Sequence, residues 1–373
     1  MIKKKCNICR QKFLEILKLG NHPCADTFLK SKSLSLKLKQ YPLAVGFCKC
    51  SHMTSIYSVP DYNRYEKHDY SYTSDNSPVS RSHFKNIAIK ICKKFKLTKD
   101  HLVIEAGSND GTFLKEIRKF SGAKVLGVDP SKNISKIAKK KKIKTIVNYF
   151  SKKTAFEILN NYGKCDVIYG ANVFNHVDDN IDFLNGASLI LKKKGVLILE
   201  VPDLKSLIEK VGFDTIYHEH RHYYSEKSLN KILKLKGFNI FHIEKIKYMA
   251  GSLRIFARKK KNDLRINLTG VKFKEFKNFK RKVPEVIKEI KNFVIKNKKS
   301  NKVICGIGAA TKGNTLLNCC KFTDKDIKFI LDNSKYKINK YTPKSGIKII
   351  KVLFLNQLTR KNCHYSYASF SYK

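Results

Sequence analysis

The sequence lacks any apolar run long enough to cross a membrane. Its apolar stretches, such as residues 195–201, are far shorter than the roughly 20 residues that a transmembrane helix needs. No apolar segment follows Met1, because the chain opens with the lysine- and cysteine-containing run MIKKKCNICR. We therefore expect no secretory signal and no membrane partner, and we predict a soluble, cytoplasmic protein.

Arginine and acidic residues are scarce beside lysine. The 373 residues include 77 Lys and Arg against 30 Asp and Glu, a formal net charge of +47, but only ten are arginine. Such a charge attracts any polyanion, yet arginine is the residue favoured for bidentate recognition of phosphates and bases. The lysines are spread along the chain in short runs, such as 139–142 and 259–261. The pattern favours a lysine-biased composition over specific nucleic-acid binding.

Internal repeats are also absent, and the length exceeds the roughly 250–300 residues of a single core, so we expect two or three domains. Strand and helix patterns alternate from residue 102 onward. Strands are predicted at 102–105, 124–128, 166–169 and 196–201, and helices at 82–97, 111–120, 134–141 and 181–191. This order predicts an α/β fold with a doubly wound parallel sheet. A second α/β section begins near residue 301, after a lysine-rich and mostly helical connector.

Eleven cysteines in a chain expected in the cytosol do not indicate a disulfide framework. Four of them form two close pairs about forty residues apart, and two such pairs can supply four thiolates to tetrahedral zinc. The second pair has one residue fewer than the usual spacing, so His52 or Cys24 stays open as a replacement ligand. Since four protein ligands leave no position for water, we predict a structural Zn²⁺ site. Its predicted ligands are Cys6, Cys9, Cys48 and Cys50.

A glycine-containing run at 103–112 lies between a predicted strand and a helix. Gly107 and Gly111 suit a backbone that turns sharply and approaches a ligand closely. Asp129, eighteen residues after Gly111, ends the next strand, where a carboxylate can accept hydrogen bonds from two ribose hydroxyls. No further glycine is present to hold a pyrophosphate, which favours S-adenosylmethionine over NAD. A Rossmann turn that binds nothing is the alternative. The predicted donor-binding residues are Glu105, Gly107, Ser108, Asn109, Gly111, Asp129 and Asn172.

The run that begins at Gly170 contains no Asn-Pro-Pro-Tyr-like motif. That motif often follows the fourth strand of methyltransferases that act on amide or nucleobase nitrogens. Its absence argues against methylation of a nucleobase or of a protein amide.

Taken together, these motifs resemble the S-adenosylmethionine-dependent sugar C-methyltransferases of deoxysugar biosynthesis. The resemblance extends from Cys6 to about Ile350. It rests on the first cysteine pair and on motifs at 41–43 (YPL), 70–74 (YSYTS), 105–112 (EAGSNDGT), 127–130 (GVDP), 172–179 (NVFNHVDD), 200–202 (EVP), 213–220 (FDTIYHEH) and 311–318 (TKGNTLLN).

The resemblance implies three parts and a reaction. A zinc-binding module with a tyrosine-rich loop is expected at 1–80, a donor-binding methyltransferase domain at 81–260, and a C-terminal Rossmann-like domain at 261–373. A nucleotide-sugar substrate would lie between the last two, with carbon 3 of a 4-keto-6-deoxy sugar as the methylated atom. We expect a monomer. The implied catalytic residues are Tyr72, His176, Tyr217, Glu219 and His220, with His220 as the base.

These residue types suit carbon methylation. A carbon beside a ketone becomes nucleophilic when a base removes its proton and the resulting enolate is stabilised. Histidine is a suitable base near neutral pH, and a tyrosine hydroxyl can donate to the enolate oxygen. Metal binding by His218 and His220, or simple core packing of Tyr217 and Tyr72, are the alternatives.

Some features depart from the family's pattern and keep other functions open. The tail from about 352 to 373 differs from the family's ending, so we expect a shortened C-terminal domain. An altered C-terminus would fit a non-catalytic remnant, and a zinc knuckle with a basic chain would fit an RNA methyltransferase. The glycine-rich turn at 306–313 is expected to help hold the nucleotide sugar, with Lys312 near a phosphate.

Overall fold

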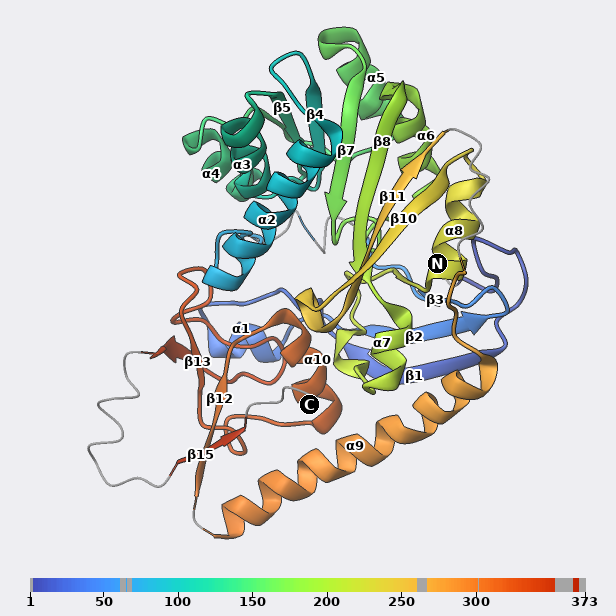
Figure 1. Ribbon diagram of the computed structural model, residues 1–373. Coiled ribbons are helices and arrows are strands. Elements are labelled where there is room, and N and C mark those ends of the chain that lie inside the picture. Colours follow the sequence, from blue (N-terminus) through green and yellow to red (C-terminus); the bar gives the residue numbers. More distant parts are fainter. Residues whose placement is uncertain are drawn as a thin grey trace.

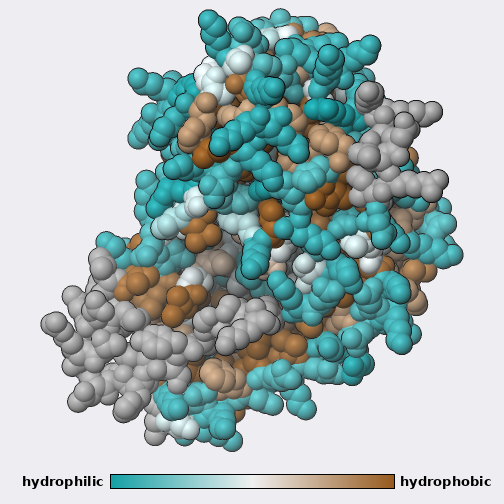
Figure 2. Space-filling view, in the orientation of Figure 1, coloured by the Kyte–Doolittle hydropathy of each residue, from teal (hydrophilic) through white to brown (hydrophobic). Residues whose placement is uncertain are grey.

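The computed structural model describes residues 3–60, 65, 69–259, 267–300, 302–352 and 365–368. These residues form three sheets, joined by helices on their faces and edges (Figure 1). In the same ranges, no helix combines the length and the apolar character that crossing a membrane requires. Hydrophilic side chains cover most of the visible surface, while apolar ones gather over the part that holds the C-terminal section (Figure 2).

The first sheet has the strand order β1-β2-β3-β9. Its first three strands are antiparallel and come from the start of the chain, where α1 (Lys32–Leu36) precedes β2. The fourth, β9, pairs with β3 although it lies about 170 residues later in the sequence. The N-terminal sheet is therefore completed by a strand from within the range 81–260. The strands are β1 (Glu15–His22), β2 (Tyr41–Cys48), β3 (His52–Ser55) and β9 (His222–Tyr224).

The central sheet has seven strands in the order β10-β11-β8-β7-β4-β5-β6. Five of them run parallel, the four predicted strands and the short β6, and the Rossmann-like α/β fold is confirmed. The parallel strands are β4 (Leu102–Ala106), β5 (Lys124–Val128), β6 (Thr145–Ile146), β7 (Cys165–Ala171) and β8 (Leu191–Pro202).

Two strands at one edge depart from the expected parallel arrangement. β10 (Asn239–Ile246) and β11 (Ser252–Arg258) are antiparallel to each other, and β11 is antiparallel to β8. Only the short turn at Tyr248–Ala250 joins them, and so short a connection permits only antiparallel pairing. The strand propensity of a segment does not indicate whether it pairs in a parallel or an antiparallel direction.

Helices cover both faces of the central sheet, because its strands are apolar on both sides. On β4, Val103 packs with the helices α2 and α3, and the adjacent Ile104 packs on the opposite face with α5, α6 and α8. These helices are α2 (Pro78–Phe95), α3 (Thr112–Ser121), α4 (Lys132–Lys140), α5 (Lys152–Tyr162), α6 (Asn180–Ile190) and α8 (Glu226–Lys234). The short helix α7 (Leu204–Glu209) packs instead with the core of the N-terminal sheet.

The C-terminal section is a parallel sheet in the order β14-β13-β12-β15. Phe47 of β2 stacks on Phe276 of α9 at a ring-centroid distance of 4.7 Å, so this helix runs along the N-terminal sheet towards β12 (Figure 1). Much of the divergent tail, 353–364 and 369–373, lies outside the described residues. The elements are α9 (Phe273–Lys299), β12 (Val303–Ile307), α10 (Thr311–Cys320), β13 (Ile330–Asp332), β14 (Ile349–Lys351) and β15 (Tyr365–Ala368).

Candidate active site and metal centre

The four predicted zinc ligands lie together. Cys6 and Cys9 belong to a tight turn before β1, Cys48 is the last residue of β2, and Cys50 lies in the turn between β2 and β3. Their sulfur atoms all lie within 4.8 Å of one another. In a tetrahedral site with Zn–S bonds of about 2.3 Å, the sulfurs are about 3.8 Å apart, so the group has the size that zinc requires.

The electrostatics of the group also call for a cation. Hydrogen bonds with Cys48 and Cys6, together with burial, raise the pKa of Cys50 well above its usual range. Deprotonation of a second thiol beside a negatively charged sulfur is unfavourable unless a positive charge lies nearby. A bound divalent ion supplies this positive charge. These residues therefore fit Zn²⁺, which would hold the two turns together.

The alternative ligands occupy other positions. Nδ1 of His52 lies 3.4 Å from Sγ of Cys6, which makes it a hydrogen-bond partner of a ligand. Cys24 is outside the sulfur group among the residues that the structure describes. The short spacing of the second pair thus still brings both of its sulfurs into the group, because Cys48 ends β2 and Cys50 lies in the following turn.

Replacing Cys9 with serine is expected to remove bound zinc and to lower the free energy of unfolding by about 3 kcal/mol or more. Elemental analysis would give the zinc content per chain, and urea titration the stability. Cys24→Ser is the matched control, since Cys24 is outside the group, and should keep its zinc. Retention of one zinc per chain by the Cys9 variant would overturn the ligand assignment.

The predicted donor loop leaves the carboxyl end of β4, beside the point where the strand order reverses. The backbone N–H groups of Gly107 and Ser108 donate to the carbonyl of Val128 at 2.8 and 3.1 Å. Gly107 and Gly111 have φ angles of 68° and 74°, which favour glycine. A Cβ on Gly111 would lie 2.9 Å from the side chain of Ile143, so a larger residue does not fit there. In open α/β sheets this edge is where ligands bind.

Asp129 closes the loop from the next strand. Its carboxylate accepts hydrogen bonds from the backbone N–H of Asn109 at 2.8 Å and of Ser131 at 2.9 Å. Each carboxylate oxygen keeps a lone pair, so hydroxyl groups of a ribose can still donate to it. Asp129 is therefore fixed in place directly after β5, with free acceptor positions as the predicted ribose contact requires.

Two buried polar atoms of this loop lack hydrogen-bond partners among the described residues: Oε2 of Glu105 and Oγ of Ser108. Burial, together with Asp110 and Asp129, raises the pKa of Glu105 well above its usual range. A positively charged ligand beside these carboxylates would offset their repulsion, and S-adenosylmethionine carries a sulfonium and an ammonium group. The site therefore fits the predicted methyl donor.

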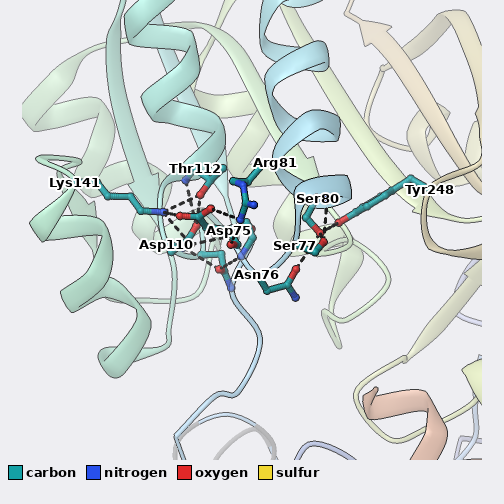
Figure 3. Close-up of polar contacts among 11 residues, drawn as sticks. Asp75, Asn76, Ser77, Ser80, Arg81, Asp110, Thr112, Lys141 and Tyr248 are labelled. Carbon is teal, nitrogen blue, oxygen red and sulfur yellow. Dashed lines mark hydrogen bonds and ion pairs between the residues drawn. The ribbon is translucent and has the colours of Figure 1, made fainter. Parts of the chain in front are cut away.

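Residues 70–75, which we call the strap, lie across this loop. Asn109 accepts from the N–H of Ser74 at 2.9 Å and donates to the carbonyl of Tyr72 at 3.2 Å. The N–H of Asp75 donates to Asp110, and Lys141 binds both of these carboxylates (Figure 3). The strap is thus held on the donor loop by several independent bonds and is placed to cover a bound donor.

Three of the five predicted catalytic residues lie together. The rings of His176 and His220 meet edge to face with centroids 4.8 Å apart, and Tyr217 Oη lies 2.7 Å from Nε2 of His220. His176 follows β7 and His220 precedes β9. Since β7 is the parallel neighbour of β4, His176 and the donor loop flank the same switch point of the sheet.

The hydrogen bonds of His220 determine which nitrogen can act as a base. Nδ1 lies 2.9 Å from the carbonyl of Thr215, and because a carbonyl only accepts, this nitrogen carries the proton. Nε2 then keeps its lone pair and accepts from Tyr217. Burial lowers the pKa of His220 to about 4, so the imidazole is neutral at physiological pH.

The other two predicted catalytic residues point elsewhere. Oε1 of Glu219 accepts from the backbone N–H of Asp26 at 3.1 Å. The hydroxyl of Tyr72 lies 3.1 Å from that of Tyr248, which is in the turn between β10 and β11. The hydroxyl of Ser80 also contacts the hydroxyl of Tyr248 (Figure 3). The predicted donor residue Asn172 has a φ of 53° and donates its N–H to the carbonyl of Glu200.

Several residues of this region were not anticipated from the sequence. Tyr65 Oη lies 2.8 Å from Nδ1 of His176, and Tyr248 stacks on His83 at 3.8 Å. Nearby buried charges, Asp26 and Asp129 among them, act with burial to raise the pKa of Tyr70 well above its usual range. The sequence shows only that tyrosines are frequent here, which does not indicate which of them face the site.

Lowering the pH from 7 to 5 is expected to destabilise the zinc-loaded protein, because burial lowers the pKa of both His218 and His220 to about 4. Above pH 6.5 these groups are neutral in both states. Between 6.5 and 4 only the unfolded chain takes up their protons, which costs roughly 2 kcal/mol for each at pH 5. Urea unfolding of the wild type and His218→Gln would test this.

In the wild type, His218 and His220 together lower the free energy of unfolding between pH 7 and pH 5. In His218→Gln only His220 remains, so this loss should be about half as large. His242→Gln serves as the comparison, because it replaces a histidine that is 40% exposed rather than buried. A free energy of unfolding that is constant between pH 7 and 5 would contradict the buried, neutral state of these histidines.

Comparison with known families matches three consecutive parts of the chain. A zinc-binding domain matches residues 6–63, a methyltransferase domain matches 85–243, and a C-methyltransferase C-terminal domain matches 248–362. The succession of these three domains is the one that the sequence motifs indicated.

Individual proteins of known sequence or structure are also similar to this chain. The C-methyltransferase NovU of Streptomyces niveus is 27% identical over 361 residues, which cover 92% of this chain and 85% of the relative. A ubiquinone biosynthesis O-methyltransferase of Pelagibacter ubique is 31% identical over 112 residues, 30% of this chain and 45% of the relative. Among solved structures, the magnesium protoporphyrin IX methyltransferase of Synechocystis with bound S-adenosylmethionine has a TM-score of 0.37 and 16% identity, covering 48% and 79% of the two chains.

Proposed function

Because the chain belongs to the S-adenosylmethionine-dependent C-methyltransferases, we propose that it methylates a carbon beside the ketone of a nucleotide-linked keto-deoxysugar. Carbon 3 of a 4-keto-6-deoxy sugar is the proposed position. One observation carries the proposal: a neutral imidazole nitrogen and a tyrosine hydroxyl, 2.7 Å apart, at the edge of the sheet that also holds the donor loop. These are the base and the oxyanion donor that enolate formation requires.

The proposed chemistry uses His220 and Tyr217 in sequence. When the sugar enters, the Tyr217 hydroxyl turns from Nε2 of His220 to the ketone oxygen and donates to it. Nε2 then takes the proton from the adjacent carbon, and the charge that develops on the oxygen is stabilised by Tyr217. S-adenosylmethionine supplies an electrophilic methyl group to the carbon. His176, edge-on to His220, limits the orientation of that ring.

Burial keeps this pair ready for proton transfer. Burial and the nearby Glu219 raise the pKa of Tyr217 well above its usual range, so the phenol stays protonated as a donor. Burial also keeps His220 neutral. Once the site has excluded water, the imidazolium that forms is stabilised by the enolate beside it.

The C-terminal section supports binding of the nucleotide part of the substrate. It repeats the backbone geometry of the donor loop: the N–H of Gly308 donates to Leu331 at the end of β13, at 2.7 Å. Asp332 then accepts from the N–H of Ala309 at 2.7 Å and of Ser334 at 2.6 Å, as Asp129 does at the donor loop. We propose that this turn holds the nucleotide, with Lys312 at its phosphates. The division of the chain into 1–80, 81–260 and 261–373 belongs to the same proposal.

Incubation with S-adenosylmethionine and a dTDP-4-keto-6-deoxy sugar would test the function. We expect the sugar to gain one methylene unit by mass spectrometry, and NMR of the product to show the new methyl group on carbon. Total RNA, as a parallel acceptor, should take up no label from methyl-labelled donor. Transfer to RNA but not to the sugar would contradict the proposal.

A further inference from the structure

Asp26 is the residue at which four separate segments of the chain meet. It lies before α1, between the first two strands of the N-terminal sheet, and is 7% exposed. Its Oδ1 accepts from the hydroxyls of Ser71 at 2.6 Å and of Thr311 at 2.9 Å, and its Oδ2 accepts from the N–H of Ser71 at 3.0 Å. Its own N–H donates to Glu219. The buried carboxylate is thereby bonded to two distant parts of the chain, and the backbone N–H of the same residue is bonded to a third.

Each of these partners belongs to a different part of the proposed site. Ser71 is in the strap, whose neighbouring residues are bonded to the donor loop through Asn109 and Asp110. Glu219 lies next to His220 in the proposed acceptor side. Thr311 is the first residue of α10, which follows the C-terminal glycine turn. Asp26 is therefore bonded both to the strap, on the side of the methyl donor, and to Glu219, on the side of the sugar acceptor.

Further bonds keep the first turn of α10 close to the acceptor side. The side-chain amide of Asn314 donates to the carbonyl of Ala25 at 2.7 Å. The hydroxyl of Thr315 donates to the carbonyl of Ile216 at 3.2 Å. Lys312 forms an ion pair with Asp214 at 3.3 Å. A displacement of Asp26 would thus be transmitted to the start of α10 and to the segment that precedes His220.

We propose that Asp26 is a positioning residue that couples closure of the strap over the methyl donor to the arrangement of the acceptor side. Ser71 and Thr311 share Oδ1 of Asp26, and the backbone N–H of Asp26 donates to Glu219, so a shift of the strap changes all three contacts together. Binding of one substrate then favours binding of the other, and this coupling is reciprocal. The identities of the two substrates rest on the proposed function, but the mechanical link does not.

Hydrogen exchange with S-adenosylhomocysteine as the only ligand would test the link without an acceptor. In the wild type we expect slower exchange in the strap, in the first turn of α10 and at 217–220. In Asp26→Asn, where an amide NH₂ replaces one acceptor, the bonds of the strap to Asn109 and Asp110 remain, so we expect slower exchange at the donor loop and in the strap but not in the first turn of α10. Calorimetry should give a dissociation constant for S-adenosylhomocysteine about tenfold higher than in the wild type.

Two further variants keep the proposal testable if Asp26→Asn fails to fold. Thr311→Val cuts only the bond to α10, so ligand-dependent protection should remain in the strap and vanish from α10. Asp100→Asn, at an exposed position away from these contacts, should behave as the wild type. Unchanged protection of α10 in both the Asp26 and the Thr311 variants would overturn the proposal, whether or not the protein methylates a keto-sugar.

Discussion

Replacing His220 with asparagine is expected to lower kcat by about 10²- to 10⁴-fold while leaving the affinity for S-adenosylmethionine unchanged. Asparagine keeps a donor for the carbonyl of Thr215 but lacks the basic lone pair that Nε2 offers beside Tyr217. The donor loop is built from other segments, so donor binding does not depend on this ring. Steady-state kinetics with a keto-sugar and calorimetry with the donor would measure the two effects separately.

The neighbouring His218 provides a matched control. It is buried in the same motif, but its Nε2 lies 3.3 Å from the carbonyl of Pro42 and it takes no part in the cluster of His176, Tyr217 and His220. His218→Asn should therefore keep a kcat close to that of the wild type. Equal losses of activity in the two variants would mean that the motif acts through folding rather than through a base at His220.

The second large effect is expected at the donor loop. Replacing Asp129 with alanine should raise the dissociation constant of S-adenosylmethionine about 100-fold, equivalent to about 3 kcal/mol. The change leaves the buried N–H groups of Asn109 and Ser131 without their acceptor and removes the carboxylate that we predict to bind the ribose. Calorimetric titration with S-adenosylmethionine measures this directly.

Asp332→Ala is the matched control for Asp129→Ala, because Asp332 has the same backbone partners at the C-terminal turn. It should leave the affinity for the donor unchanged and raise the KM for the nucleotide sugar. If Asp332→Ala weakened donor binding and Asp129→Ala did not, the two turns would have the opposite roles.

Local motifs explain why much of the molecule could be predicted from its sequence. The donor loop, the cysteine pairs and the alternating elements of the central sheet each depend on residues close together in the chain. Gly107 and Gly111 need left-handed backbone wherever that loop occurs, and Asp129 follows at a fixed distance. The two cysteines within each pair are likewise close in the chain, and the pairing of β1 with β2 then brings the two pairs together.

Contacts between distant segments explain what the sequence did not reveal. Asp26 is a single acidic residue in no recognisable pattern, and its role emerges only when Ser71, Thr311 and Glu219 are placed around it. The pairing of β9 with β3 depends in the same way on residues about 170 positions apart. The glycine-rich turn at Gly308 could be recognised in the sequence. Its likeness to the donor loop became clear only from the structure, which places Asp332 where it accepts from the N–H of Ala309.

The most direct test of enolate formation at His220 is hydrogen exchange at the sugar itself. A dTDP-4-keto-6-deoxy sugar would be incubated in heavy water with the protein and S-adenosylhomocysteine, which holds the donor site but has no methyl group to transfer. Mass spectrometry should show uptake of one deuterium beside the ketone with the wild type and none with His220→Asn. Equal uptake with both proteins, or none with a wild type shown to bind S-adenosylhomocysteine, would contradict the account.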